Sequence, residues 1–445
     1  MQPRSRKRGG GWLMFGISWL GQTFSRRWAP RTLQARNIRY LSLDTATQGI
    51  IGAGIGSFLA VFLVRMGASN VAVGLLMSAP ALASIFLSVP GGTLAEGRRD
   101  LVRLVNLWRL PIRLTYLLVA LVPLIAMGET GAIMIVALWT LTAWPSAVVN
   151  PAWTNVVAET VPPDVRPRVN GNRWALLSIV TAVAVAAFGR LLDEVVFPLN
   201  YQIVFAISFV AGLVSIYFFS LIRMPETPAS AKRARAVPRQ NPVEVVVDLA
   251  RSFREEGEFA RYTISTLVYR LGLNLPAALF PIFWVQNLRA SDTTIGLRTT
   301  AGNAALVVAY YLWGRVAARQ GHRRVLIVSG LGLSLYPILT ALVATPDMLV
   351  PVAVVWGAFA AGIDIAFFEA LLRTCPPDRR ATFVAANTAF ANLAVFVAPL
   401  TGTFLAGLMD IRLVLILAGV LSLAGAVLFY TMAVGRQPEP AISSQ

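Results

Sequence analysis

The apolar residues of this chain gather into blocks that are each long enough to cross a membrane. A helix needs about 20 apolar residues to span a hydrocarbon core roughly 30 Å thick. Backbone N–H and C=O groups must bond internally in lipid, so we expect these blocks to be helices. Only 13% of the residues are charged, against roughly 25% in globular domains. The blocks fall approximately at residues 40–64, 70–90, 104–127, 131–157, 169–191, 200–222, 262–288, 294–314, 324–343, 348–372, 383–408 and 412–435.

The second half of the chain repeats the pattern of the first half 222 residues later. Residues that recur at this spacing include Arg39 as Arg261, Phe58 as Phe280, Gly74 as Gly296 and Gly92 as Gly314. We therefore predict an all-α membrane protein with 12 transmembrane helices in two parallel six-helix repeats, at residues 38–222 and 260–435. Parallel repeats of this kind are typical of two-bundle transporters, whose substrate site lies between the bundles.

Three polar segments lie outside the predicted repeats. Residues 1–37 are expected to form a basic cytoplasmic segment with an amphipathic helix on the membrane surface, the alternative being a disordered basic tail. Residues 223–259 form a linker that lets the second bundle enter the membrane from the same side as the first. Residues 436–445 form a cytoplasmic tail.

The net charge of +18 is divided unevenly between the two sides of the predicted membrane domain. On one side, the loops hold only four basic residues, which are Arg65, Arg190, Arg289 and Arg412. The other side, with both tails, holds most of the rest. The positive-inside rule therefore predicts cytoplasmic termini, here in a bacterial inner membrane. Basic residues on that side meet anionic headgroups, so we expect membrane lipid and not nucleic acid as the partner of this charge.

The chain has one cysteine, Cys375, and one histidine, His322. These numbers exclude an internal disulfide, a metal site built from His or Cys, and a Ser-His triad in the membrane. No Walker sequence G-x-x-x-x-G-K-[ST] occurs, so ATP does not drive the protein directly. We expect no cofactor and no enzymatic activity. An enzyme acting on lipid is an alternative, but the blocks lack a clustered carboxylate pair for that chemistry.

Two loops carry related sequences rich in glycine and arginine. The loop after the second block reads G-T-L-A-E-G-R-R at residues 92–99, and the loop after the eighth reads G-R-V-A-A-R-Q-G-H-R-R at residues 314–324. Both resemble the signature G-x-L-a-D-r-x-G-r-k of the major facilitator superfamily. The first copy is two residues shorter, and the second has Ala318 where the acid belongs. The sequence P-P-D also recurs, at residues 162–164 and 376–378. The resemblance covers residues 38–434.

The resemblance implies a cytoplasmic gate formed by these loops. Glycine allows two helices to approach closely, and an acid at a helix end can bond arginines and the positive N-terminus of a helix from the other bundle. The alternative is that the arginines of these loops only fix the orientation of the protein in the membrane and form no gate. The predicted gate residues are Gly92, Glu96, Arg98, Arg99, Gly314, Arg319, Gly321 and Arg323.

Polar residues inside the blocks are candidates for the substrate and coupling path. Charges inside a bilayer are expensive and usually face a cavity or a partner. The resemblance implies that helices 1, 4, 7 and 10 line the central cavity. The repeat aligns Gln48 with Arg270 and Asn150 with Asp364, as expected where two walls have diverged around an asymmetric substrate. The candidates are Asp44, Gln48, Asn150, Arg270, Asn274, Asp364 and Glu369.

Arg270 and Asp364 are the deepest opposite charges among these candidates. We hypothesise that they form an ion pair which a substrate or a proton breaks, the alternative being a permanent salt bridge. Asp44 lies five residues from Arg39 and is either a titrating group or a shallow, hydrated carboxylate. We expect Arg109 to reach the lipid headgroups and Arg113 to enter the bundle interior.

These features together predict a monomeric secondary active transporter that moves a small solute by alternating access. Proton coupling through Asp364 or Asp44 is the expected energy source. The fifth helix lacks the G-P-x-x-G-G sequence of the superfamily's drug antiporters, which counts against a standard drug exporter. The alternative function is a transport-inactive sensor or accessory membrane subunit.

Overall fold

The computed structural model describes residues 32–95, 100–162, 165–224, 257–374, 380–432 and 434. The predicted surface helix within residues 1–31, most of the linker, and the C-terminal tail lie outside these ranges. Within them, the chain forms helices, turns and bends but no strands. The prediction of an all-α protein is therefore confirmed for the described part of the chain.

The helices follow the twelve predicted blocks closely. The first helix begins earlier than expected, at Leu33 rather than near residue 40. The elements of the first half are α2 (Leu33–Ile51), η1 (Gly52–Gly56), α3 (Ser57–Arg65), α4 (Asn70–Ala95), α5 (Leu101–Leu121), η2 (Val122–Leu124), α6 (Gly128–Leu141), α7 (Ala143–Thr160), α8 (Arg166–Glu194) and α9 (Leu199–Ser220). Those of the second half are α12 (Gly257–Asn274), α13 (Leu279–Ile282), η3 (Phe283–Asn287), α14 (Asp292–Gln320), α15 (His322–Ala341), η4 (Pro346–Met348), α16 (Leu349–Thr374), α17 (Arg380–Leu408) and α18 (Ile411–Thr431).

Among the described residues, eleven helical stretches are long and apolar enough to cross a membrane. The predicted span that is missing from these eleven is the eighth block, residues 294–314. It corresponds to α14, which is 29 residues long and so extends about 44 Å at 1.5 Å per residue. Its length is sufficient, but its composition is more polar than that of the other spans. It packs along α8 of the other half as well as along α16 of its own.

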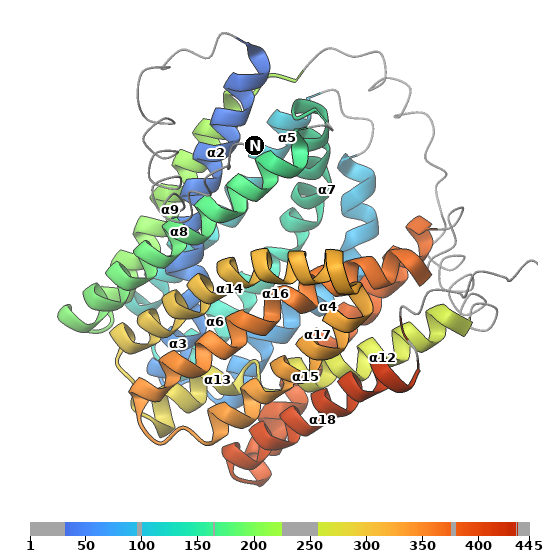
Figure 1. Ribbon diagram of the computed structural model, residues 1–445. Helices are drawn as coiled ribbons and strands as arrows, with labels where there is room; N and C mark the ends of the chain where they lie inside the picture. The colour runs from blue at the N-terminus through green and yellow to red at the C-terminus, as the bar shows by residue number, and fades with distance from the viewer. Residues whose placement is uncertain are drawn as a thin grey trace, which may run out of the picture.

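The helices pack as two bundles, one from each half of the sequence (Figure 1). In the first bundle α2 contacts α8 and α9, and α5 contacts α7 and α9; in the second, α12 contacts α17 and α18, and α14 contacts α16. Two long helix pairs join the bundles: α8 with α14, and α4 with α17.

The turn after the first spanning helix has the same form in both repeats. Gly67 adopts φ 84° and Arg289, which lies 222 residues later, adopts φ 51°. Ser69 and Ser291 then cap the next helix, each accepting a hydrogen bond from the backbone N–H three residues on. The repeat seen in the sequence is therefore also a repeat of backbone conformation.

The first spanning helix of each repeat is irregular at the same place. Gly52–Gly56 form a π-helical turn, η1, in the first repeat, and the matching residues 274–278 are where α12 ends in the second. Pro276 explains that end, because proline has no N–H and disfavours helical geometry at the residue before it. In η1 a Cβ on Gly54 would lie 2.1 Å from the Ser208 hydroxyl of α9, so glycine is required there for close helix packing.

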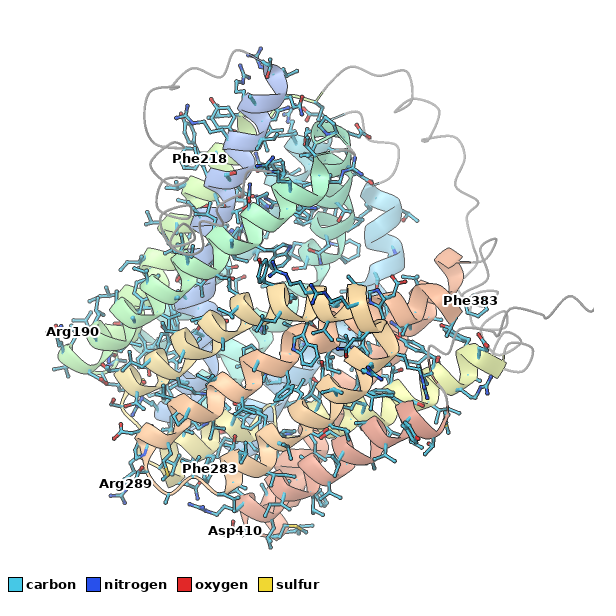
Figure 2. All side chains as sticks on the ribbon, in the orientation of Figure 1. Arg190, Phe218, Phe283, Arg289, Phe383 and Asp410 are labelled. Atoms are coloured by element: carbon cyan, nitrogen blue, oxygen red, sulfur yellow. The ribbon has the colours of Figure 1, made fainter. Side chains whose placement is uncertain are left out.

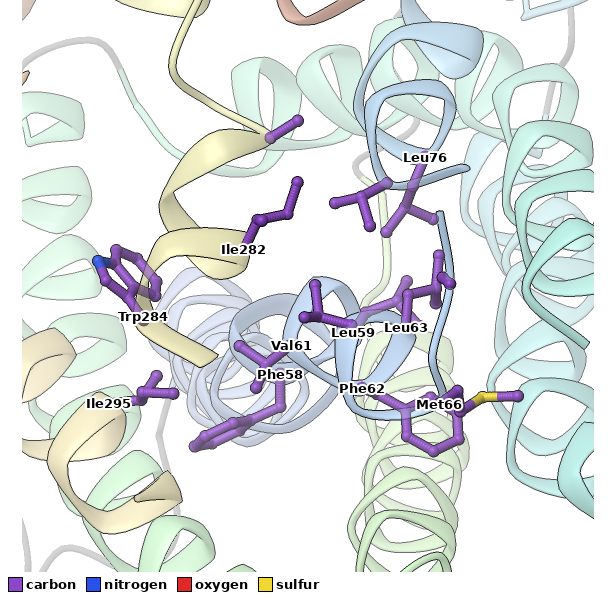
Figure 3. Packing of buried hydrophobic residues seen from close by; sticks show 14 of the residues in the cluster. Phe58, Leu59, Val61, Phe62, Leu63, Met66, Leu76, Ile282, Trp284 and Ile295 are labelled. Carbon is purple, nitrogen blue, oxygen red and sulfur yellow. The ribbon is translucent and has the colours of Figure 1, made fainter. Parts of the chain in front are cut away.

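Among the described residues, the buried hydrophobic clusters join the two bundles at one end. One cluster contains residues of both halves, including Phe58, Val185, Leu279 and Val414, and Figure 3 shows Phe58 and Leu59 beside Ile282 and Trp284. The other two clusters are each confined to one half, around Leu41, Val105 and Phe219 in the first and around Tyr262, Val325 and Phe383 in the second. We call the end that carries residues 65–70 and 288–292 the joined end, where Figure 2 labels Arg289, and the opposite end the separate end.

Candidate functional site

A chain of hydrogen bonds runs through the interior of the first bundle. The Asp44 carboxylate on α2 accepts hydrogen bonds from Arg109 on α5 at 2.9 Å and from the Ser215 hydroxyl on α9 at 2.6 Å. The Gln48 amide donates to Ser215 at 3.0 Å and accepts from Arg113 at 3.2 Å. Two of the predicted path residues, Asp44 and Gln48, thus lie in one network between three helices.

One of the two alternatives for Asp44, and the expectation for Arg109, are wrong. Asp44 is 1% exposed and not a shallow, hydrated carboxylate, and Arg109 is 5% exposed and does not reach the headgroups. Arg109 instead forms an ion pair with Asp44 and lies over the Phe219 ring at 4.5 Å. Arg113 does enter the bundle, as expected, and donates to the Tyr116 hydroxyl at 2.6 Å. Counting residues along each helix estimates how far a side chain lies from the helix end. It does not show which faces of neighbouring helices contact each other.

Arg173 on α8 was missed by the sequence reasoning. Its guanidinium donates to the Thr45 hydroxyl of α2 at 2.9 Å and lies over the Trp153 ring of α7 at 5.0 Å. It therefore connects three helices of the first bundle. A charged residue within the fifth apolar block was a signal that could have drawn attention to it.

The hypothesised Arg270–Asp364 ion pair does not form in this structure, since no ion pair within 4.0 Å joins these two described residues. The Arg270 guanidinium lies over the Phe367 ring at 5.0 Å, and its buried Nε has no hydrogen-bond acceptor. Asp364 is exposed and accepts a hydrogen bond from Tyr310 of α14 at 2.7 Å. Each of the two charged groups therefore contacts an aromatic residue instead of the other charge: Arg270 contacts Phe367, and Asp364 contacts Tyr310.

In the described part of the chain, the side chains of Asn150 and Asn274 form no hydrogen bond with the side chain of another path candidate. Asn274 donates to the Arg270 carbonyl of its own helix at 2.7 Å. Asn150 is exposed on α7, and Glu369 is half-buried on α16. Their place in a substrate path therefore remains a prediction.

The glycine-rich motifs are only partly described. Glu96, Arg98 and Arg99 lie outside the described residues. A Cβ on Gly92 or Gly314 would meet nothing within 4 Å, whereas one on Gly91 would lie 2.6 Å from Ala147. The close helix approach expected at Gly92 is therefore made by its neighbour, Gly91.

The second copy of the motif terminates α14. Gly321 adopts φ 83° at the end of this helix, a conformation that favours glycine. Arg323 donates to the Tyr430 carbonyl of α18 at 3.2 Å, within its own bundle, and Arg319 is exposed. These contacts show a structural use for the motif, and a gating role remains a prediction.

A polar cluster that the sequence reasoning did not foresee joins the two bundles. Arg65, at the end of α3, donates to the Asp292 carboxylate at 3.0 Å and to the Ala290 carbonyl at 2.9 Å. The Tyr201 hydroxyl of α9 donates to the same Asp292 carboxylate at 2.8 Å. Asp292 is the first residue of α14 and is 3% exposed. The sequence had assigned Arg65 only a role in topology.

The N-terminus of α14 receives a second carboxylate from the first bundle. Asp193 of α8 accepts hydrogen bonds from the backbone N–H groups of Asp292 and Thr293 at 2.9 and 2.8 Å. An acid is favourable there because a helix N-terminus carries partial positive charge. We call Arg65, Asp193, Tyr201 and Asp292 the joined-end cluster.

The architecture defines a class of protein, which has two helical bundles related by an internal repeat and helices long and apolar enough to cross a membrane. The sequence profile of the Major Facilitator Superfamily matches residues 41–257 and 262–445. The chain belongs to this superfamily.

Solved structures with the same fold include two groups of transporters. The crystal structure of the nucleoside transporter NupG is similar with a TM-score of 0.65 and 14% identity, over 92% of this chain and 100% of that chain. A bacterial homologue of the human lysosomal transporter Spinster, in an inward-facing and occupied conformation, is similar with a TM-score of 0.67 and 14% identity, over 91% of this chain and 98% of that chain. A comparison with curated protein sequences finds no match.

Proposed function

We propose that this protein is a secondary active transporter that moves a small solute by alternating access of its two bundles. The observation that carries the proposal is the unequal joining of the bundles: they share a hydrophobic core at one end and have separate cores at the other. The excess of Lys and Arg at the separate end makes that end cytoplasmic by the positive-inside rule. The described conformation is then inward-facing, with both termini in the cytoplasm.

The joined-end cluster is a suitable outer gate in this proposal. The Arg65–Asp292 ion pair and the Asp193 cap cross from one bundle to the other, so opening this end must break them. Gates of this kind work because packed interfaces have discrete arrangements and do not deform continuously. The predicted cytoplasmic gate, Glu96, Arg98 and Arg99, would form in the opposite state.

Proton coupling through Asp364 is favoured over coupling through Asp44. Asp44 is buried, paired with Arg109 and bonded to Ser215, so its protonation would leave a buried arginine without its counter-charge. Asp364 is exposed and bonded only to a neutral hydroxyl among the contacts described. We propose a monomer in a bacterial inner membrane, with a small solute, protons and membrane lipids as its partners.

Distance measurements between spin labels test the alternating-access proposal. In a background lacking the single cysteine, Cys375, label pairs are placed at exposed positions of both ends, Thr130 with Asp347 and Arg103 with Glu258. Asp292→Asn removes the charge that holds Arg65. We expect the population with a longer Thr130–Asp347 distance to grow, and the Arg103–Glu258 distance to shorten in that population.

The matched control breaks an ion pair that does not cross between the bundles. Arg190 pairs with Glu194 on the same helix at 2.8 Å, exposed and near the joined end, and Arg190→Gln should leave both distance distributions unchanged. If Asp292→Asn opened the joined end while the separate end stayed open, the bundles would not alternate. A single unchanged arrangement in all variants would favour the transport-inactive sensor.

A further inference from the structure

The interior of the first bundle holds more positive than negative charge. Arg109, Arg113 and Arg173 all contribute to it: Arg109 bonds the Asp44 carboxylate, Arg113 bonds the Gln48 amide and Arg173 bonds the Thr45 hydroxyl. Among the described residues, Asp44 forms an ion pair with Arg109 and with no other arginine. Arg113 is bonded to Gln48 and Tyr116, which are both neutral. Within the described ranges of the chain, Arg113 and Arg173 therefore have no carboxylate within ion-pair distance.

Arg173 and Arg270 share an unusual environment, one in each bundle. Each lies over an aromatic ring at 5.0 Å, Arg173 over Trp153 and Arg270 over Phe367. None of the described carboxylates lies within 4.0 Å of either guanidinium. An aromatic face attracts and orients a guanidinium, but it does not cancel the charge. Both groups remain available to an anion.

The two arginines also lie on the same side of the shared core. Counting along the chain from the separate end, Val185 is the first buried residue of α8 in that core. Leu275, directly after α12, is the first buried residue of the second half in it. Arg173 and Arg270 precede them, toward the separate end. Arg173 is seven residues from the start of α8, or about 10 Å, and Arg270 is thirteen residues from the start of α12, or about 20 Å. Both lie within helical stretches long and apolar enough to cross a membrane, where an ionisable residue marks a functional site.

We propose that the transported solute is an organic anion, a carboxylate or a phosphate monoester, bound by Arg270 with Arg173 as the cationic group of the opposite bundle. The planar guanidinium suits both anions, because its donors match two oxygens at once. An anion that attracts arginines of both bundles binds more tightly when the separate end closes, and that difference in affinity shifts the conformational equilibrium. This inference rests on the proposed function.

Thermal shift of the purified protein with matched probes tests the proposal. The anions are benzoate, succinate, gluconate and glucose 6-phosphate, and the uncharged partners are benzamide, succinamide and glucose; choline serves as a cation. We expect at least one anion to raise the Tm of the wild type while its uncharged partner does not. Arg270→Gln should lower the apparent affinity for that anion roughly 30-fold or more, because a charged partner of the bound anion is lost.

Further variants separate charge from packing. Arg270→Lys keeps the charge and should retain part of the anion binding. Arg173→Gln should weaken binding in the same direction as Arg270→Gln. Arg190→Gln, the same change at an exposed arginine away from both sites, should leave binding unaltered. Anion binding that persists in both Arg173→Gln and Arg270→Gln would overturn the proposal, as would a panel in which no anion stabilises the wild type.

Flux measurements in proteoliposomes distinguish this inference from the function on which it rests. If a neutral or cationic solute is transported and Arg270→Gln does not slow it, the protein is a transporter but its solute is not an anion. If the anion binds and no solute crosses the membrane, the anion site stands and the transport function fails. Transport of the anion that is lost in Arg270→Gln supports both.

Discussion

At the scale of single residues, the Asp44–Arg109 pair is a buried ion pair inside the first bundle. Both side chains are at least 93% buried, with exposures of 1% and 7%. Removing one partner of a buried pair leaves an uncompensated charge, which typically costs about 3–5 kcal/mol. We therefore expect Asp44→Asn and Arg109→Met each to lower the thermal stability of the detergent-purified protein strongly.

The double variant tests whether the cost comes from the unpaired charge. Asp44→Asn combined with Arg109→Met should recover a large part of the lost stability, because neither charge remains. Arg190→Gln is the matched control at an exposed pair and should not change the melting temperature. Additive losses in the double variant would show that the pair itself contributes little, and that packing around each side chain dominates.

The sequence predicted which polar side chains lie inside the apolar blocks, but it did not predict which residues those side chains contact. Asp44, Gln48 and Arg270 were recognised because polar groups in apolar blocks stand out. Their contacts depend on the rotation of each helix about its axis, which residue spacing within one helix does not fix. Asp44 meets Arg109, Ser215 and, through Ser215, Gln48 because α2, α5 and α9 converge there. The joined-end cluster was missed for a similar reason, since Arg65 and Asp292 come from different bundles.

At the scale of elements, the apolar blocks predicted most of the helix boundaries. Apolar length is set by the bilayer, so blocks and helices agree within a few residues in most spans. The exception in composition is α14, whose polar groups contact the other bundle: Thr300 donates to the Ala182 carbonyl of α8 at 2.9 Å. A helix that faces a protein partner does not need the apolar surface that lipid demands, so hydropathy alone describes it poorly.

The paired turns after the first helix of each repeat give a prediction at this scale. Gly67 and Arg289 both have positive φ, which costs an ordinary residue roughly 1–2 kcal/mol. Gly67→Ala should therefore lower the melting temperature, and Arg289→Gly should raise it, because Arg289 is exposed. Circular dichroism melting in detergent measures both. A loss of stability in Arg289→Gly would mean that contacts of the arginine outweigh its backbone conformation.

At the scale of the whole molecule, the bundles approach through glycines at the joined end. A Cβ on Gly296 of α14 would lie 2.9 Å from the Val185 carbonyl of α8, and one on Gly74 of α4 would lie 2.8 Å from the Thr403 hydroxyl of α17. The two helix pairs that hold the bundles together therefore each depend on a glycine. These two glycines also occupy equivalent positions in the repeat, 222 residues apart.

Gly296→Leu should act as a wedge that separates the bundles at the joined end. The new side chain has no space against α8, so the two helices must move apart, and the spin-label distance between Thr130 and Asp347 should lengthen. Gly171→Leu is the control on α8, the helix that Gly296 faces, because a Cβ on this exposed glycine meets nothing within 4 Å; its distance distribution should match that of the unsubstituted protein. An unchanged joined end in Gly296→Leu would show that α8 and α14 adjust locally, and that their contact does not control the arrangement of the bundles.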